Sequence, residues 1–270
     1  ALDQGLALRR GPAALIRKMN LLLFVHGDVA QANTLLESVP QPYRLKPEAA
    51  YFAFAAAYWR RSATDCLAAL RPVTDEVFHG VYLPTETVGI PRGFLLGQSH
   101  ALANNRAAAE KSWRDALAVM DRLGTQQPND SGWIYWQAYL HALLGARPEA
   151  ERCLGLFQQL QGQSEPTLFT LPILMLLDRQ EEVLAFIERT ERNARGGSPP
   201  SPVPGGIVPL FLSRAWLEAT LPHRLRLDPA FDSLRGNPRF EAALAGFPAG
   251  QAALKVTAKS IAVLAFRQYG

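Results

Sequence analysis

"PRGFLLGQSHALANNRAAAEKSWRDALAVMDRL", residues 91–123, is the stretch that decides the fold. Its apolar residues recur at helical intervals on both sides of Asn104–Asn105, so it predicts two helices joined by a short turn. Gly97 lies where the first helix needs a small residue, while Ala109 and Trp113 give the second helix a small and a large residue four positions apart. Small residues let helix axes approach closely, and a large one fills the gap between neighbouring hairpins.

The same helix pair recurs along most of the chain. Comparable segments, separated by Pro or Gly punctuation, are 12–40, 47–72, 131–160 and 165–193. Turns are expected at Gly27–Asp28, Gly145 and Asp178, in addition to Asn104–Asn105. A helix pair that repeats in this way, with almost no alternating strand pattern, predicts an all-α protein built as a solenoid of antiparallel hairpins.

Segment 91–123 resembles a tetratricopeptide repeat, through Gly97, Ala109, Trp113 and Ala116. Other segments carry parts of the same pattern: Ala32 and Leu36, and then Ala138, Ala150 and Leu154. The resemblance implies a right-handed α-solenoid of tetratricopeptide-like hairpins whose first helices line a concave groove. It also implies that such a chain recognises a partner rather than catalysing a reaction.

Composition sets the outer bounds. With 270 residues, 48% of them apolar and 19% charged, the chain can form a sizeable core of its own. The net charge of +4 comes without a run of basic residues, which argues against a nucleic-acid partner. Cys66 and Cys153 are expected as reduced core residues. The longest apolar stretch, 168–177, is too short to span a bilayer, so no membrane partner and a cytoplasmic location are expected.

The chain divides by composition into an array, a linker, a cap and a tail. Residues 1–195 form the helical-hairpin array, and "GGSPPSPVPGG" at 196–206 is a Pro/Gly linker. Residues 207–250 hold a C-terminal helix and a capping segment, and 251–270 form a tail with the strand-like segment 259–266. An unpaired strand needs a ladder partner, so this segment is expected to pair with a second copy, giving a homodimer, or to lie in an apolar groove.

"LRLDPAFDSLRGNPRFEAAL", residues 225–244, is either a structural plug or a catalytic cluster of Asp228, Asp232 and Glu241. Asp228–Pro229 and Asn237–Pro238 have the pattern of helix starts, in which a cap residue precedes Pro at the first helical position. Apolar residues at helical spacing form one face, Asp228 is expected as a cap, and Asp232 and Glu241 are expected opposite Arg235 and Arg239. The plug is therefore the favoured interpretation, because the last hairpin of a solenoid has an uncovered face.

Residues 225–244 also resemble the segment that ends tetratricopeptide arrays in multidomain bacterial signalling proteins. In those families the array follows a winged-helix domain, an adenylate cyclase or a Ser/Thr kinase, often with a TolB-like domain between. The tail 259–266 resembles the first strand of that TolB-like domain, although here it comes after the array. No glycine-rich phosphate loop, kinase catalytic loop or recognition-helix unit is present in the sequence.

The sequence therefore predicts a non-enzymatic interaction or scaffolding module that binds a peptide or partner domain in a concave groove. The groove residues are expected to be Arg17, Gln98, Tyr135 and Tyr139. The alternatives are a small-ligand sensor domain of a transcriptional regulator and a helical-repeat nucleic-acid binder, which would need regular polar pairs. No catalytic residue, cofactor or metal site is expected, and an enzyme would need a convergent acid pair that is not visible.

Two segments leave a structural question open. "SGWIYWQAY", residues 131–139, places four aromatic residues in one helix, where they serve either as binding anchors or as packing against a neighbouring helix. The connection 71–93 is long for a structureless loop, so it predicts a helical turn around 74–79 and an extended excursion that folds over the groove.

Overall fold

The computed structural model describes residues 15, 18–79, 89–127, 130–162, 165–196 and 214–247, with only the backbone described for 214–219. This part of the chain is almost entirely helical, which confirms the all-α prediction. The first pair consists of η1 (Leu21–Val25), a π-helix, and α3 (Val29–Ser38). Gly27 joins them with a φ of 64°, and Asp28 caps α3 by accepting from the backbone N–H of Gln31.

The expected helix pairs are present at the expected places. The helices of the array after α3 are α4 (Gln41–Arg44), α5 (Pro47–Trp59), α6 (Ala63–Leu70), α7 (Arg92–Leu102), α8 (Arg106–Gly124), α9 (Ser131–Leu143), α10 (Arg147–Leu160), α11 (Leu171–Leu176) and α12 (Gln180–Arg195). Asn104, Gly145 and Asp178 adopt left-handed backbone conformations at the turns, with φ of 56°, 75° and 57°. The sequence did not point to Arg61, which makes the turn between α5 and α6 with a φ of 58°.

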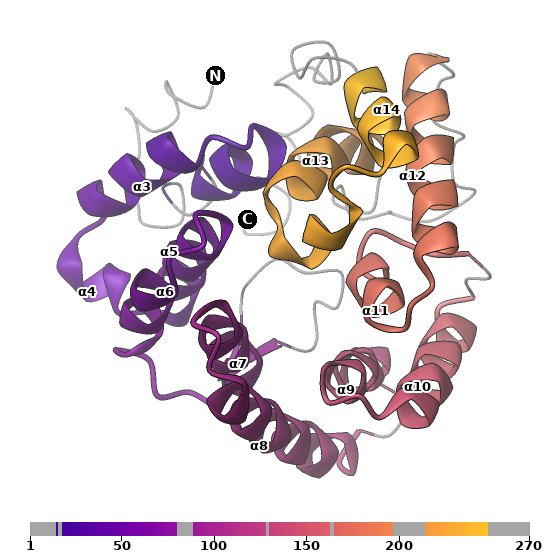
Figure 1. Ribbon diagram of the computed structural model, residues 1–270. Helices are drawn as coiled ribbons and strands as arrows, with labels where there is room; N and C mark the ends of the chain where they lie inside the picture. The colour runs from indigo at the N-terminus through magenta and orange to yellow at the C-terminus, as the bar shows by residue number, and fades with distance from the viewer. Residues whose placement is uncertain are drawn as a thin grey trace, which may run out of the picture.

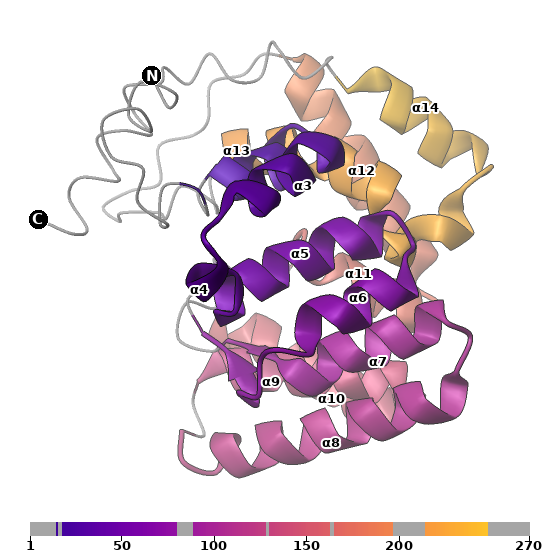
Figure 2. The ribbon, with the colours of Figure 1, turned by 90° about the vertical axis from the view of Figure 1, so that its left-hand side faces the viewer.

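The pairs follow one another around a curve (Figure 1). Each helix from α5 to α10 packs on the next, and α11 contacts both α9 and α12. Seen from the side, α5, α6, α7 and α8 lie as successive rods across the molecule (Figure 2). The arrangement leaves an inner side toward which α5, α7 and α9 face.

The packing of small residues against a large one that was expected for segment 91–123 is present in the structure. A Cβ placed on Gly97 would collide with the indole of Trp113, so α7 and α8 cross at this glycine. Ala109 and Ala116 are buried beside that crossing. The small residues of the next hairpin, Ala138 and Ala150, are fully buried as well. Close helix approach at small residues is therefore the packing rule of the array.

The connection between α6 and α7 differs from the prediction. In place of a helical turn around 74–79, β1 (Val77–Phe78) pairs antiparallel with β2 (Ile90–Pro91), with Phe78 opposite Ile90. Both of these side chains are buried in the main core. The prediction rested on the length of the connection alone, and burial of a β-branched and an aromatic residue instead favours a short strand pair here. The excursion proposed to fold over the groove lies mostly outside the described residues.

The C-terminal segment consists of α13 (Arg214–Leu227), η3 (Pro229–Leu234) and α14 (Pro238–Gly246). The helix expected at 207–221 thus continues past Pro222 to Leu227, and its residues before 214 lie outside the described part. The capping prediction is confirmed: Asp228 accepts from the N–H of Ala230, and Asn237 accepts from that of Arg239. Most of the linker and the whole tail 251–270 also lie outside the described residues.

This segment does more than cover the last hairpin. α14 packs on α12 and η3 contacts α11, but α13 packs on η1 at the other end of the array. In Figure 1 α13 and η3 therefore occupy the space between the two ends of the curve. The C-terminal segment closes the curve into a ring of helices.

Candidate binding site

A cavity of about 130 Å³ lies on the inner side of the ring. Most of its walls come from the first helices of three hairpins, α5, α7 and α9, and α13 adds a further side. The residues that line it are Asn20, Phe24, Tyr51, Phe54, Ala55, Tyr58, Trp59, Ile90, Phe94, Leu95, Gln98, Tyr135, Trp136, Tyr139, Leu168, Phe169, Thr220, Arg224 and Asp228.

Aromatic rings form most of the wall. Phe94 of α7 lies 4.9 Å, between ring centroids, from both Trp136 and Tyr139 of α9. The rings of Trp136 and Tyr139 are nearly parallel, 4° apart with centroids separated by 6.2 Å. Positions 135, 136 and 139 share one face of α9, so the aromatic run of this helix faces the cavity. Flat, polarisable walls of this kind are suited to a ring-shaped ligand.

The α13 side of the cavity carries an ion pair. Arg224 donates through Nε to Oδ2 of Asp228 at 3.2 Å, and the two side chains keep accessible fractions of only 21% and 12%. Burial alone would lower the pKa of Arg224, but Asp228 and the surrounding tyrosines raise it overall, so Arg224 stays cationic. Because Nε serves Asp228, the guanidinium Nη groups remain as additional donors.

Two polar atoms in the lining are buried without a hydrogen-bond partner among the described residues. They are Nε1 of Trp136 and Oγ1 of Thr220, in side chains that are 3% and 2% exposed. Two other lining groups have partners: Gln98 Nε2 donates to the Tyr58 hydroxyl at 3.3 Å, and the Tyr135 hydroxyl donates to the carbonyl of Phe169 at 3.2 Å. Buried polar atoms without partners are uncommon, and both of these belong to side chains of the lining although the atoms themselves are covered.

The tyrosines around the cavity remain neutral at physiological pH. Burial raises the pKa of Tyr51 to about 12 and holds those of Tyr58, Tyr135 and Tyr139 above the ordinary value. A phenol that stays protonated can donate and accept hydrogen bonds, but it offers no phenolate to act as a general base. The arrangement can therefore bind and orient a molecule.

Three of the four expected groove residues, Gln98, Tyr135 and Tyr139, line this one cavity. Arg17 lies outside the described residues. The sequence reasoning missed Tyr51, Phe94 and Arg224 and assigned Asp228 only a capping role. The four-residue spacing of Arg224 and Asp228 was a usable signal, because residues so placed on a helix can form an ion pair.

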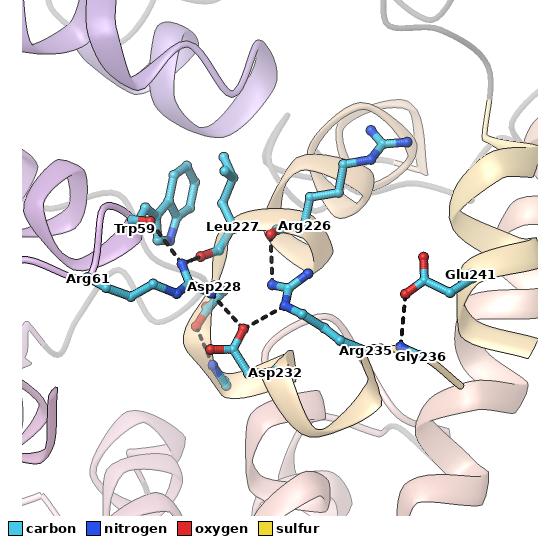
Figure 3. Close-up of polar contacts among 10 residues, drawn as sticks. Trp59, Arg61, Arg226, Leu227, Asp228, Asp232, Arg235, Gly236 and Glu241 are labelled. Carbon is cyan, nitrogen blue, oxygen red and sulfur yellow. Dashed lines mark hydrogen bonds and ion pairs between the residues drawn. The ribbon is translucent and has the colours of Figure 1, made fainter. Parts of the chain in front are cut away.

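The carboxylates of residues 225–244 have structural partners (Figure 3). Asp232 accepts from Arg61 Nη2 at 2.6 Å and from Arg235 Nε at 2.8 Å, as expected for Arg235. Arg61 also donates to the carbonyl of Leu227 at 2.7 Å, which ties α13 to the start of the array. Glu241 accepts from the N–H of Gly236 at 3.2 Å. These contacts favour the structural plug over a catalytic cluster.

The expected pairing of Glu241 with Arg239 is absent from the hydrogen bonds of the described residues. Arg239 instead donates to Glu188 and to Glu181 of α12, at 2.7 Å in each case. The reason is that α14 packs against α12, so the long guanidinium reaches the acidic residues of the neighbouring helix. This contact fastens the C-terminal segment to the last hairpin.

The described part of the chain offers few other residues that could form a catalytic or metal-binding site. Cys66 and Cys153 are buried free thiols there, as expected. His100 and His141 lie half-buried on α7 and α9, and no cluster of three metal-ligating side chains is found among the described residues. None of the described helices combines the length and the apolarity that crossing a bilayer requires.

No family model, no curated protein and no solved structure matches this chain. The inner cavity is therefore the feature from which function is inferred.

Proposed function

We propose that this chain is a non-enzymatic binding module, a right-handed tetratricopeptide-like α-solenoid with a C-terminal cap, that holds a small organic ligand in its central cavity. The observation that carries the proposal is a cavity of about 130 Å³ that is walled largely by aromatic side chains and bordered by the mostly buried ion pair of Arg224 and Asp228. A bound molecule would fill this volume and pack against the aromatic rings.

A small ligand suits this cavity better than a peptide does. The volume of about 130 Å³ is close to that of the roughly 150 Å³ engineered cavity that binds benzene in another protein. α13 lines this cavity and packs on η1, so less of the inner face is left for a peptide or partner domain. For the inner face, a small-ligand sensor domain is therefore favoured over a module that binds a peptide or partner domain in an open groove. The resemblance of residues 225–244 to bacterial signalling arrays supports a regulatory role in such a protein.

Ligand binding would be coupled to closure of the ring. The lining includes α5 and α7 of the array together with α13 of the C-terminal segment, so a ligand touches both sides of the junction. A molecule that binds only the closed form stabilises that form by mass action. This gives the module a means of reporting occupancy to whatever it is attached to.

The experiment uses single-ring probes and a variant whose cavity is filled. Toluene, benzamide, benzoate and benzylamine are titrated against the protein while ligand signals are followed by NMR. Ala55→Leu adds bulk to the lining and should abolish binding, whereas Ala101→Leu, at an exposed position of α7, should leave it intact. If no probe binds, or if Ala55→Leu binds as the unaltered protein does, the cavity is not a ligand site.

A further inference from the structure

We infer that the ligand of the central cavity is a zwitterion, an α-amino acid with a single-ring side chain, whose carboxylate is held by Arg224 and whose ammonium group is held by Asp228. The inference rests on the proposed function and specifies the chemistry of its ligand. Three properties of the lining lead to it, namely the ion pair that borders the cavity, the polar atoms that reach accessible space, and the aromatic walls.

The ion pair leaves both of its partners able to bind more. Arg224 contacts Asp228 through Nε alone, at 3.2 Å, and its Nη groups make no hydrogen bond among the described residues. These groups are also not among the covered polar atoms without a partner, so they reach accessible space. A guanidinium presents its N–H groups in a planar fork that matches a carboxylate. Asp228 accepts one bond at Oδ1, from the N–H of Ala230, and one at Oδ2, and each oxygen can accept a second.

Charge balance limits the ligand to one without net charge. Among the described residues that line the cavity, the charged ones are Arg224 and Asp228, and their charges cancel. A molecule with only a carboxylate or only an ammonium group would bring a charge that nothing compensates into this low-dielectric space. A zwitterion adds no net charge, and each of its two charges meets an opposite charge of the ion pair.

The neutral polar groups of the lining can both donate and accept. The hydroxyls of Tyr51 and Tyr139 make no hydrogen bond among the described residues and are not among the covered unpaired atoms, so they too reach accessible space. Gln98 uses its Nε2 for the Tyr58 hydroxyl, which leaves Oε1 as an acceptor, and Asn20 adds a second amide. An ammonium group needs acceptors and a carboxylate needs donors, and this lining supplies both.

The walls favour one ring as the side chain of the amino acid. Phe94 lies 4.9 Å, between ring centroids, from both Trp136 and Tyr139, a range in which aromatic groups attract. The volume of about 130 Å³ admits roughly one six-membered ring with a substituent, by comparison with the cavity that holds benzene. The charged end of such a ligand would lie on α13 while its ring lies against α7 and α9, so the ligand would bridge the C-terminal segment and the array.

The first test ranks probes that share one ring by affinity, with calorimetry or ligand-observed NMR on the full chain. Phenylalanine is zwitterionic, 3-phenylpropionate lacks its ammonium group, 2-phenylethylamine lacks its carboxylate, and benzamide is polar but uncharged. Phenylalanine should bind at least about tenfold more tightly than each of the others, because only it gives both members of the ion pair a partner. Any of the three binding as tightly as phenylalanine overturns the inferred ligand chemistry but leaves small-ligand binding in place. Failure of every probe, toluene included, overturns both proposals.

One substitution tests the role of Arg224. Arg224→Lys keeps the positive charge beside Asp228 but loses the planar fork, so it should weaken phenylalanine binding roughly 5–50-fold and leave toluene binding unchanged. Arg226→Lys is the matched control, because Arg226 donates to the carbonyl of Leu244 and lies outside the lining. Unchanged phenylalanine binding, or an equal loss for toluene, would overturn the assignment of Arg224. If Arg224→Lys does not fold, the ranking of probes on the unaltered protein still decides the ligand class.

Discussion

Gly97 and Gly155 both lie inside helices of the array, but their surroundings are opposite. A side chain at Gly97 would meet the buried indole of Trp113, whereas a Cβ at Gly155 of α10 would meet nothing within 4 Å. Gly97→Ala should therefore lower the free energy of unfolding by about 1–3 kcal/mol through overpacking. Gly155→Ala should raise it by about 0.5–1 kcal/mol, because alanine loses less backbone entropy in a helix.

Urea denaturation of the two variants measures both effects with the same chemical change. A Gly97→Ala protein as stable as the unaltered one would mean that α7 and α8 do not cross at this glycine. The tetratricopeptide-like register of segment 91–123 would then be wrong.

His223 makes one junction sensitive to pH. It packs against Gly27, and its pKa is lowered by burial and by the neighbouring charges of Arg226 and His26. The folded protein therefore binds fewer protons than the unfolded chain, whose histidine titrates near 6.5. The free energy of unfolding should therefore have its full value above a pH of about 6.5 and should fall as the pH drops below that value.

The measurement compares urea unfolding at pH 7.5 and pH 5.5. His223→Asn should lose less stability on acidification than the unaltered protein, and His100→Gln, a half-buried histidine on α7, should not have this effect. An identical pH response for His223→Asn and the unaltered protein would exclude His223 as the source.

At the scale of elements, helix pairs could be predicted because their signals are local. Asn105 caps α8 by accepting from the N–H of Ala108, and the turns at Gly145 and Asp178 fall where the sequence placed them. The pairing of β1 with β2 could not be predicted, since it depends on burial against distant helices. The continuation of α13 through Pro222 was missed for a related reason, because packing against η1 overrode the local signal.

The 3₁₀ helix η3 anchors the C-terminal segment through one ring. Phe231 is fully buried in the main core, while Ser233 of the same element is exposed. Phe231→Ala should lower the free energy of unfolding by about 3–5 kcal/mol, since it removes a large buried side chain and leaves a cavity. Ser233→Ala should change it by less than about 0.5 kcal/mol. If chemical denaturation showed that Phe231→Ala lowers the free energy of unfolding no more than Ser233→Ala does, the interpretation of residues 225–244 as a structural plug would be contradicted.

At the scale of the whole molecule, the candidate site was only half visible in the sequence. The repeat register placed Gln98, Tyr135 and Tyr139 on the inner side of the array, and all three line the cavity. Arg224 and Asp228 come from a segment with no repeat register, so their approach to the array depends on how α13 folds back. Sequence periodicity describes contacts between neighbouring hairpins and carries no information about ring closure.

A chain that stops at Leu227 tests closure directly. It lacks η3 and α14, whose buried residues Phe231, Leu234, Phe240 and Leu244 belong to the main core. The shortened protein should melt at a lower temperature than the full chain, bind a hydrophobic dye and aggregate, because apolar surface is left uncovered. Calorimetry and light scattering measure this outcome. An equally stable monomer would show that the C-terminal segment is dispensable.

The hydrogen bonds from Arg61 to Leu227 and Asp232 also determine the order in which parts of the protein can fold during synthesis. These contacts join residues 166 and 171 positions apart, whereas the hairpins form between neighbours in sequence. A ribosome delivers the N-terminal hairpins first, and they can fold as they emerge, but closure must wait until η3 has left the exit tunnel. Until then the aromatic inner faces of α5, α7 and α9 are bare. The nascent chain is thus a natural client for chaperones, and slow codons placed before residue 228 should increase its losses to aggregation.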